Sequence, residues 1–278
     1  MVVFPNAKLN LGLFVTEKRN DGFHNLESVF VPIPLADILE IVPSNEFQLT
    51  VTGLTFSGVQ TENIVYKAWK LLHDNHACPS VHVYLRKIIP AGAGMGGGSS
   101  NGAFMLQALN DFFQLNIDRK VLLQYASHLG SDCPFFLYNK PMLVTGRGEV
   151  LTEIDFQCEE SWLVLVKPTV SISTKEAFSG ILPQASMMNW KEFVLNPELH
   201  WNNLRNDFEL SVFPNYPELE EIKNTLLSFD PFFCSMTGTG STVFALYKKE
   251  PHMSEALFES CFFWKVKYNF TRQLLPLS

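Results

Sequence analysis

The stretch PAGAGMGGGSSNGAFML, residues 90–106, holds six glycines, two serines and an asparagine between ordinary apolar segments. Glycine at this density loses much conformational entropy on folding, so it needs a physical reason. A flexible linker would need neither Met95 nor the apolar run that follows Gly102. We therefore interpret the stretch as a loop whose backbone must approach a bound group closely.

The bulk composition is that of a compact globular protein. The 278 residues and 46% hydrophobic content are enough to fill the core of one large domain or two. The formal net charge of −7 argues against a protein that wraps nucleic acid through its overall field. The five cysteines are scattered and never spaced as Cys-x-x-Cys, so we expect neither a disulfide framework nor a zinc site.

The sequence shows no membrane or export segment. No run of about 18 uncharged apolar residues could span a bilayer. The start, MVVFPNAKLN, lacks the charged and long apolar regions of a signal peptide. We therefore predict a cytoplasmic protein with neither a membrane nor a nucleic acid as partner.

Hydrophobic periodicity predicts a mixed order of strands and helices. Residues 7–15, AKLNLGLFV, alternate as in a half-buried strand, which places Lys8 and Asn10 on the same side. A strand over 80–89 precedes the glycine loop, and a helix over 99–113 follows it. The other strands and helices predicted in this half cover residues 27–31, 37–42 and 47–52 (strands), and 61–75 and 118–130 (helices).

The pattern restarts after Asp155. Strands are predicted over residues 162–168, 232–238, 241–247 and 262–268, with a helix over 255–260. We place a domain boundary near residue 150, which divides the chain into domains 1–150 and 151–278. No internal repeat is present.

A strand, a glycine-rich loop and a helix in succession form an anion site. Backbone N–H groups converge in such a loop, and the unpaired N–H groups and positive dipole end of the helix add to them. A surface loop with a serine N-cap would explain Ser99, but it leaves five glycines between Gly92 and Gly98 without a purpose. We therefore predict phosphate binding.

Several glycine motifs overlap here. GAGMGG matches G-x-G-x-x-G, but the acidic residue of a dinucleotide fold is missing at the end of a second strand, because Asp111 and Asp118 fall at helix ends. A P-loop needs a lysine where this loop has glycine and serine. GSSNG also matches the nucleophile elbow G-x-S-x-G at Ser100, so a serine hydrolase with Asp132 and His200 or His252 stays open as an alternative.

Four segments carry a resemblance to a known family. Residues 90–103 resemble the phosphate loop of the GHMP kinases, and residues 7–30, 128–137 and 236–247 resemble other motifs of that family, in family order. The resemblance implies an α+β, two-domain GHMP kinase fold with the active site in the interdomain cleft. It implies ATP as co-substrate and Mg²⁺ on the ATP phosphates.

The N-terminal segment is most similar to family members of the non-mevalonate isoprenoid pathway. They phosphorylate the 2-hydroxyl of a methylerythritol linked to cytidine diphosphate, and this chain is expected to do the same. Met95, Gly102 and Phe23 depart from the usual residues, and none removes a charged group. A kinase for another small alcohol and a non-catalytic nucleotide-binding regulator remain alternatives. We expect a monomer or a homodimer.

By resemblance, Lys8 and Asp132 are catalytic. Asp132 is expected to accept the proton of the substrate hydroxyl, while Lys8 keeps that carboxylate ionised and stabilises the developing alkoxide. Without the resemblance, Lys8 would pass for a solvated strand lysine and Asp132 for a turn residue after Gly130.

The resemblance also assigns binding residues. Those expected to contact ATP are Pro90, Gly92, Gly94, Gly96, Gly97, Gly98, Ser99, Ser100, Asn63 and Lys87. A hydroxyl of Ser99 or Ser100 is expected near Mg²⁺. Those expected to contact the acceptor are Asn10, Phe23, His24, Thr174, Gly238 and Gly240. In that set a cytosine would stack on Phe23, and His24 would read its polar edges. His73 and His76 lack further ligands, so no metal site is predicted there.

Overall fold

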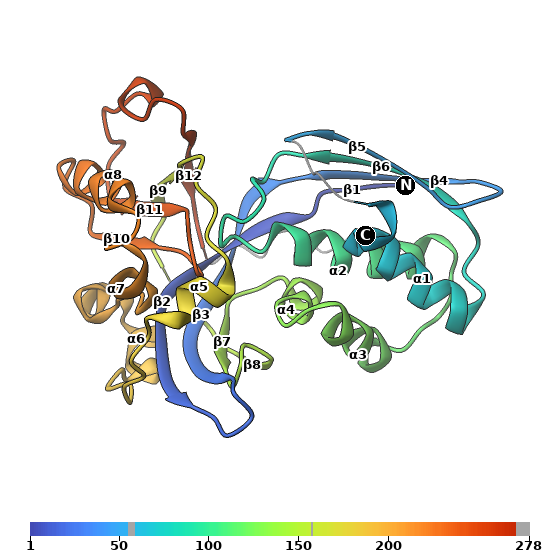
Figure 1. The fold of residues 1–278 in the computed structure, drawn as a ribbon, viewed down its shortest axis with the longest axis horizontal. Coiled ribbons are helices and arrows are strands. Elements are labelled where there is room, and N and C mark those ends of the chain that lie inside the picture. Colours follow the sequence, from blue (N-terminus) through green and yellow to red (C-terminus); the bar gives the residue numbers. More distant parts are fainter. Residues whose placement is uncertain (55–58, 157, 271–278) are drawn as a thin grey trace.

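A computed structural model describes residues 1–54, 59–156 and 158–270. Within these residues the protein is a mixed α+β structure with three four-stranded sheets (Figure 1). No helix in this part of the chain is both long and apolar enough to cross a bilayer.

The first sheet has the strand order β1-β4-β6-β5, formed by β1 (Val2–Val3), β4 (Ile38–Pro43), β6 (Val81–Lys87) and β5 (Gln48–Gly53). Strands β5 and β6 are parallel, and the other pairs are antiparallel. Alternate residues of β6, Val81, Val83 and Leu85, are buried, because helices cover one face of this sheet.

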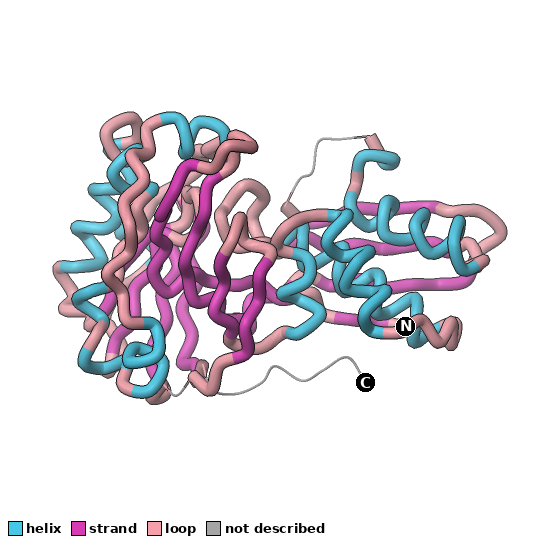
Figure 2. Tube along the Cα trace, turned by 90° about the horizontal axis from the view of Figure 1, so that it is seen from below, coloured by secondary structure: helices cyan, strands magenta, loops and turns pink. Residues whose placement is uncertain are grey.

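The covering helices belong to the same hydrophobic core. Helices α1 (Ile64–His76) and α2 (Gly97–Phe112) lie against the sheet, and α3 (Arg119–Leu129) and α4 (Cys133–Tyr138) lie beyond them (Figure 1). Figure 2 shows the helices in front of these strands when the molecule is seen from below. Gly102 allows the close approach of α1, since a β-carbon there would stand 2.7 Å from a side-chain carbon of Ile64.

The second sheet has the order β2-β3-β7-β8. It consists of β2 (Asn6–Lys18), β3 (His24–Ala36), β7 (Met142–Thr145) and β8 (Val150–Glu153), all antiparallel. The long strand β2 carries Lys8 and Asn10, both buried. Its register shifts at Gly12, where φ is +69°.

The third sheet has the order β10-β11-β9-β12 and is antiparallel throughout. Its strands are β10 (Phe233–Met236), β11 (Val243–Tyr247), β9 (Ser161–Lys167) and β12 (Phe262–Tyr268). The helices of this half are α5 (Thr174–Ser179), α6 (Trp190–Leu195), α7 (Phe208–Val212) and α8 (Pro217–Leu227). Single 3-10 turns are η1 (Gln60–Glu62), η2 (Pro197–Leu199), η3 (Trp201–Asn203) and η4 (Glu255–Leu257).

One hydrophobic core joins the second and third sheets. It contains Leu9 and Val31 from the second sheet together with Leu163 and Phe244 from the third. The core therefore includes residues on both sides of position 150, and the division into domains 1–150 and 151–278 stays a prediction.

Most of the predicted elements are confirmed, among them the strand over 7–15 and the helix over 99–113. The helix predicted over 255–260 is wrong, because only the 3-10 turn η4 forms there. Strands β7 and β8 and helix α4 were not predicted. Each has only four to six residues, too few to show a clear period.

Candidate active site

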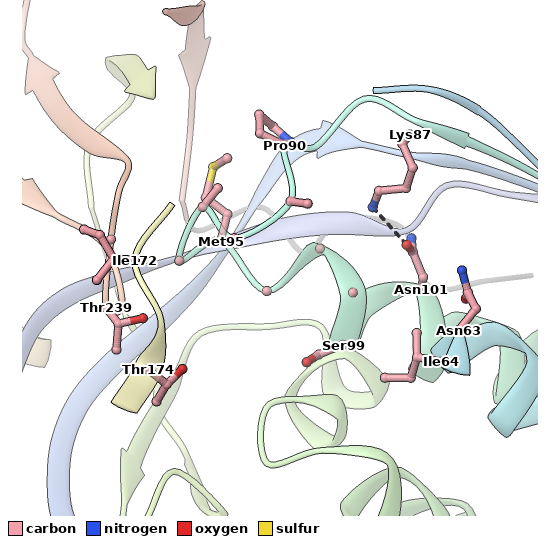
Figure 3. Close-up of a pocket in the computed structure, with 18 of the residues that line it drawn as sticks. Asn63, Ile64, Lys87, Pro90, Met95, Ser99, Asn101, Ile172, Thr174 and Thr239 are labelled. Carbon is pink, nitrogen blue, oxygen red and sulfur yellow. Dashed lines mark hydrogen bonds between the residues drawn. The ribbon is translucent and has the colours of Figure 1, made fainter. Parts of the chain in front are cut away.

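A cavity of about 510 Å³ lies along the glycine loop (Figure 3). Its lining comes from both halves of the chain. The N-terminal half contributes Val51, Glu62, Asn63, Ile64, Leu85, Lys87, Asn101 and the segment 90–99, and the C-terminal half contributes Ile172, Thr174, Thr239 and Gly240. The cavity thus contains all the residues predicted to bind ATP except Ser100, and two of those predicted to bind the acceptor.

The N-terminus of α2 opens onto this cavity. Gly96 is the N-cap residue, with φ of +69°, and the N–H of Ser100 makes the first helical bond to the Gly96 carbonyl at 2.9 Å. The N–H groups that precede it, in residues 97–99, have no partner within the helix. Because these residues line the cavity, the helix end can bind an anion there.

Glycine is needed for different reasons at different positions of the loop. At Gly94 a β-carbon would stand 2.0 Å from the carbonyl oxygen of Thr237, so this glycine is required by another part of the chain. At Gly98 a β-carbon would meet no described atom within 4 Å. Gly98 therefore leaves room that a ligand can use.

The two loop serines differ sharply in environment. Ser99 lines the cavity, as Figure 3 shows. Ser100 is completely buried, and its hydroxyl has no hydrogen-bond partner among the described residues. A buried hydroxyl without a histidine beside it cannot act as a hydrolase nucleophile, so the geometry gives the serine hydrolase alternative no support.

Lys8 and Asp132 lie together beside the glycine loop. The ammonium Nζ of Lys8 is 3.7 Å from Oδ2 of Asp132, and the two side chains are 3% and 28% exposed. The backbone N–H of Lys8 donates to the Met95 carbonyl at 3.0 Å. Strand β2 and the start of α4 thus bring a buried cation and an accessible carboxylate to the edge of the predicted phosphate site.

The Lys8 ammonium has further partners that fix its position. It donates to Oδ1 of Asn10 at 2.6 Å and lies 4.4 Å from the centre of the Phe30 ring. Burial lowers the pKa of Lys8, and the charge and hydrogen bond of Asp132 partly oppose that effect.

Asn10 connects strand β2 to the third glycine motif. Its Oδ1 accepts hydrogen bonds from the Thr237 hydroxyl at 3.1 Å and the Gly238 N–H at 2.9 Å. Its Nδ2 donates to Ser28 at 3.1 Å. The carboxamide is therefore engaged within the protein, and contact with the acceptor stays a prediction for Asn10 and for Gly238.

The hairpin between β2 and β3 presents Phe23 and His24. Phe23 is 54% exposed, and the Arg147 guanidinium lies 4.8 Å from its ring centre. The His24 ring stacks on Phe178 of α5, with centroids 5.0 Å apart. Burial, with a smaller effect of Lys18, lowers the pKa of His24, which favours the neutral imidazole.

The loop after β7 links this hairpin to Asp132. The Leu26 N–H donates to the Gly146 carbonyl at 2.6 Å. A β-carbon on Gly148 would stand 4.0 Å from Oδ1 of Asp132. Phe23 and His24 do not line the cavity of the glycine loop. The predicted acceptor residues are therefore divided, because Thr174 and Gly240 do line this cavity.

Several residues of the site were missed by sequence reasoning. Asn101 lines the cavity and follows the loop serines directly, so its position beside the motif was a usable signal. Arg147 stands between two glycines, a weaker signal of the same kind. Phe178, Asn206 and Asp37 offered no local signal, because their roles depend on partners far away in the sequence. Asn206, for example, donates to the carbonyls of Met236 and Gly238 at 2.7 and 2.8 Å.

No metal-ligand cluster is present among the described residues, where no group of three or more His, Cys, Asp or Glu side chains could hold an ion. The five cysteines are free in the structure.

Comparison with known families finds two matching regions of the chain. Residues 63–140 match the GHMP kinases N terminal domain, and residues 189–265 match the GHMP kinases C terminal region. The chain belongs to the GHMP kinase family. The predicted family and α+β fold class are thereby confirmed, and membership implies ATP as the phosphoryl donor for a small-molecule acceptor.

Individual relatives are similar over nearly the whole chain. A 4-diphosphocytidyl-2-C-methyl-D-erythritol kinase of Bacteroides fragilis is 47% identical, over 94% of this chain and 97% of its own length. The enzyme of that name from Parabacteroides distasonis is 45% identical, over 95% and 98%.

Solved structures agree with the fold of this GHMP kinase. A crystal structure of 4-(cytidine 5'-diphospho)-2C-methyl-D-erythritol kinase superposes with a TM-score of 0.83 at 29% identity, covering 95% of this chain and 98% of that one. The mevalonate kinase of Methanococcus jannaschii has a TM-score of 0.66 at 15% identity, covering 97% and 98%, and shares the fold alone.

Proposed function

We propose that this GHMP kinase transfers the γ-phosphoryl group of ATP to the 2-hydroxyl of 4-diphosphocytidyl-2-C-methyl-D-erythritol, a step of the non-mevalonate isoprenoid pathway. The observation that carries the proposal is the pairing of Lys8 with Asp132 beside the anion-binding end of α2. The near-full-length likeness to kinases of that name supports this acceptor. We further propose that the enzyme acts in the cytoplasm as a monomer or a homodimer.

The cavity of the glycine loop is the proposed ATP site. The N–H groups of Gly97, Gly98 and Ser99 would hold the phosphates, and the side chains of Asn63 and Lys87 line the same cavity. This donor set fits Mg²⁺, because Mg²⁺ takes mostly phosphate and water oxygens and the Ser99 hydroxyl adds one oxygen at the cavity wall. When bound, the ion neutralises charge on the transferring phosphoryl group.

Asp132 is the proposed general base. Its carboxylate is accessible enough to meet the acceptor hydroxyl, and it takes the proton as the oxygen attacks phosphorus. The Lys8 ammonium stabilises the negative charge that develops on the attacking oxygen. Because the ammonium is held by Asn10 and Phe30, it needs little reorganisation during transfer.

The hairpin residues are the proposed site for the cytidine part of the acceptor. The exposed ring of Phe23 offers a stacking surface. The neutral imidazole of His24, oriented by Phe178, offers one donor and one acceptor to polar groups of the base. The loop around Gly148 lies between this hairpin and Asp132, which supports a cytidine site close to the proposed general base.

An acceptor panel tests the proposal. With ATP and Mg²⁺, the purified protein should phosphorylate 4-diphosphocytidyl-2-C-methyl-D-erythritol with a kcat/KM far above that for mevalonate, homoserine or galactose. Preference for one of the other alcohols would replace the proposed acceptor, and absence of any ATP-dependent transfer would favour a nucleotide-binding regulator.

Phe23→Ala with Phe23→Tyr as its control tests the base site. Stacking of one base is worth about 1–3 kcal/mol, so Phe23→Ala should lower kcat/KM for the cytidine-linked acceptor about tenfold or more, while Phe23→Tyr keeps it. The effect should vanish with an acceptor that lacks the cytidine. An equal loss of kcat/KM for the acceptors with and without cytidine would show that Phe23 does not contact the cytosine.

A further inference from the structure

Asp37 is a carboxylate buried at the junction of β3 and β4. Its exposed fraction is 0%, so the charge has to be compensated by the protein. Oδ1 accepts the N–H groups of Ile88 and Ile89 at 2.7 and 2.8 Å. Oδ2 accepts the Asn101 amide at 2.8 Å and pairs with the Lys87 ammonium. Both carboxylate oxygens are thus fully engaged.

All four partners of Asp37 belong to the wall of the proposed ATP cavity or lead directly into it. Lys87 and Asn101 line the cavity, and Figure 3 shows their hydrogen bond, which is 2.9 Å long. Ile88 and Ile89 are the two residues between β6 and Pro90, where the glycine loop begins. Asp37 itself does not line the cavity, so any effect on a nucleotide must pass through these partners.

The Lys87 ammonium is oriented by this arrangement. Two of its three N–H groups are directed to Asp37 and Asn101. Because the ammonium is tetrahedral, those two bonds determine the direction of the third. The side chain is 11% exposed and lines the cavity, and Nζ lies 3.5 Å from the position of a β-carbon on Gly97. The remaining N–H is therefore held next to the start of α2.

The two backbone bonds act on the glycine loop. The N–H groups of Ile88 and Ile89 bind one oxygen atom, so the chain bends around the Asp37 carboxylate before it enters the loop. The Ile89 side chain in turn lies against Gly97, whose β-carbon would stand 2.8 Å from it. Asp37 therefore fixes the positions of two cavity-lining side chains, Lys87 and Asn101, and the path of the chain where it enters the glycine loop.

We propose that Asp37 is a positioning residue of the nucleotide site, which holds Lys87, Asn101 and the start of the glycine loop in the arrangement that binds ATP. The proposal rests on the assignment of this cavity to ATP. A purely structural ion pair would affect the free energy of unfolding and leave nucleotide affinity unchanged, so the two roles can be separated by measurement.

Asp37→Asn is the test variant. It keeps the size of the side chain and an oxygen for the two backbone N–H groups, but its amide cannot accept from both Lys87 and Asn101. The dissociation constant of a non-hydrolysable ATP analogue, measured by calorimetry, and KM for ATP should rise about tenfold or more, since charge-assisted bonds orient the ligand groups. KM for the acceptor should change less than about threefold, because the Lys8–Asp132 pair does not touch Asp37.

Asp207→Asn is the matched control. Asp207 is also a buried carboxylate, which accepts the Val15 N–H at 2.8 Å and pairs with Arg205 at 2.7 Å, and it does not line the cavity. The Asp207→Asn variant should have a lower melting temperature than wild type and an ATP affinity within about twofold of the wild-type value. If Asp37→Asn lowered the melting temperature with unchanged ATP affinity, the positioning role would be overturned.

A double variant keeps the proposal testable if Asp37→Asn does not fold. In Lys87→Met/Asp37→Asn no unpaired charge remains buried, so folding is expected. Because Asp37 also holds Asn101 and the entry of the glycine loop, the double variant should bind ATP more weakly than Lys87→Met alone. Equal ATP affinity of the two variants would overturn the positioning of Asn101 and the loop by Asp37. Wild-type protein that binds no ATP would instead contradict the proposed function, which distinguishes the two failures.

Discussion

The ammonium of Lys8 lies 3.7 Å from the carboxylate of Asp132, although the two residues belong to strand β2 and to the cap of helix α4. The lysine is buried and the carboxylate is partly open to solvent. This division gives one residue a fixed charge and the other access to a substrate. The predictions below follow from that pair and from the adjacent glycine loop.

Asp132→Asn should separate chemistry from binding. The amide keeps the shape of the side chain but cannot take a proton, so kcat should fall by about 10²–10⁴. The dissociation constant of ATP, measured by calorimetry, should stay close to that of wild type. Near-normal phosphoryl transfer at saturating ATP and Mg²⁺ would show that another group is the base.

Lys8 should determine the alkaline limb of the pH–rate profile. Burial lowers its pKa below the usual 10.5, so the working ammonium is lost as pH rises through that lowered value. We expect kcat/KM to fall at a pH below 10.5. Lys8→Arg, which stays protonated, should move the limb to higher pH if it retains activity, and Lys8→Met should abolish the limb. Persistence of the same limb in Lys8→Met would assign it to another group.

The lowered pKa of Lys8 also predicts how stability depends on pH. Between the folded-state pKa and 10.5 the unfolded chain binds more protons than the folded chain. The contribution of Lys8 to the free energy of unfolding should therefore rise with pH across this window and be lost as pH falls through the folded-state value. Denaturant titrations of wild type and Lys8→Met at several pH values measure the difference.

Ser99→Ala and Ser100→Ala form a matched pair. Ser99 lines the cavity, so its loss should reduce kcat about tenfold and raise the Mg²⁺ concentration needed for half-maximal activity. Ser100 has a buried hydroxyl with no partner in the described chain, so Ser100→Ala should keep activity and raise stability by about 1 kcal/mol. Equal Mg²⁺ dependence of activity in wild type, Ser99→Ala and Ser100→Ala would show that the Ser99 hydroxyl does not contact the ion.

Gly98→Ala and Gly94→Ala should fail in different ways. The new methyl group at position 98 meets no described atom, and alanine favours a helix by up to about 1 kcal/mol, so the melting temperature should hold or rise. ATP affinity should fall about tenfold if phosphate oxygens occupy that space. At Gly94 the methyl group would meet the Thr237 backbone at 2.0 Å, so the protein should be destabilised with or without ATP. Unchanged ATP affinity in Gly98→Ala would show that the ATP phosphates do not bind beside Gly98 at the start of α2.

The sequence by itself determined the local parts of this protein. Alternation in residues 7–15 predicted strand β2, and glycine density followed by apolar periodicity predicted the anion-binding start of α2. Both signals come from neighbours in the chain, where backbone preference and side-chain period act directly. The family resemblance added Lys8 and Asp132, which no period could have paired.

Only the tertiary structure decided which groups these local parts meet. From the sequence, Gly94 and Gly98 looked alike, yet one is required by the Thr237 backbone and the other leaves open space. Ser99 and Ser100 are adjacent, yet one faces the cavity and the other is buried. Asp37 had no motif at all, because its carboxylate is compensated by groups about 50 and 64 residues away. Long-range packing makes these distinctions, since burial and partners depend on segments that are distant in the chain.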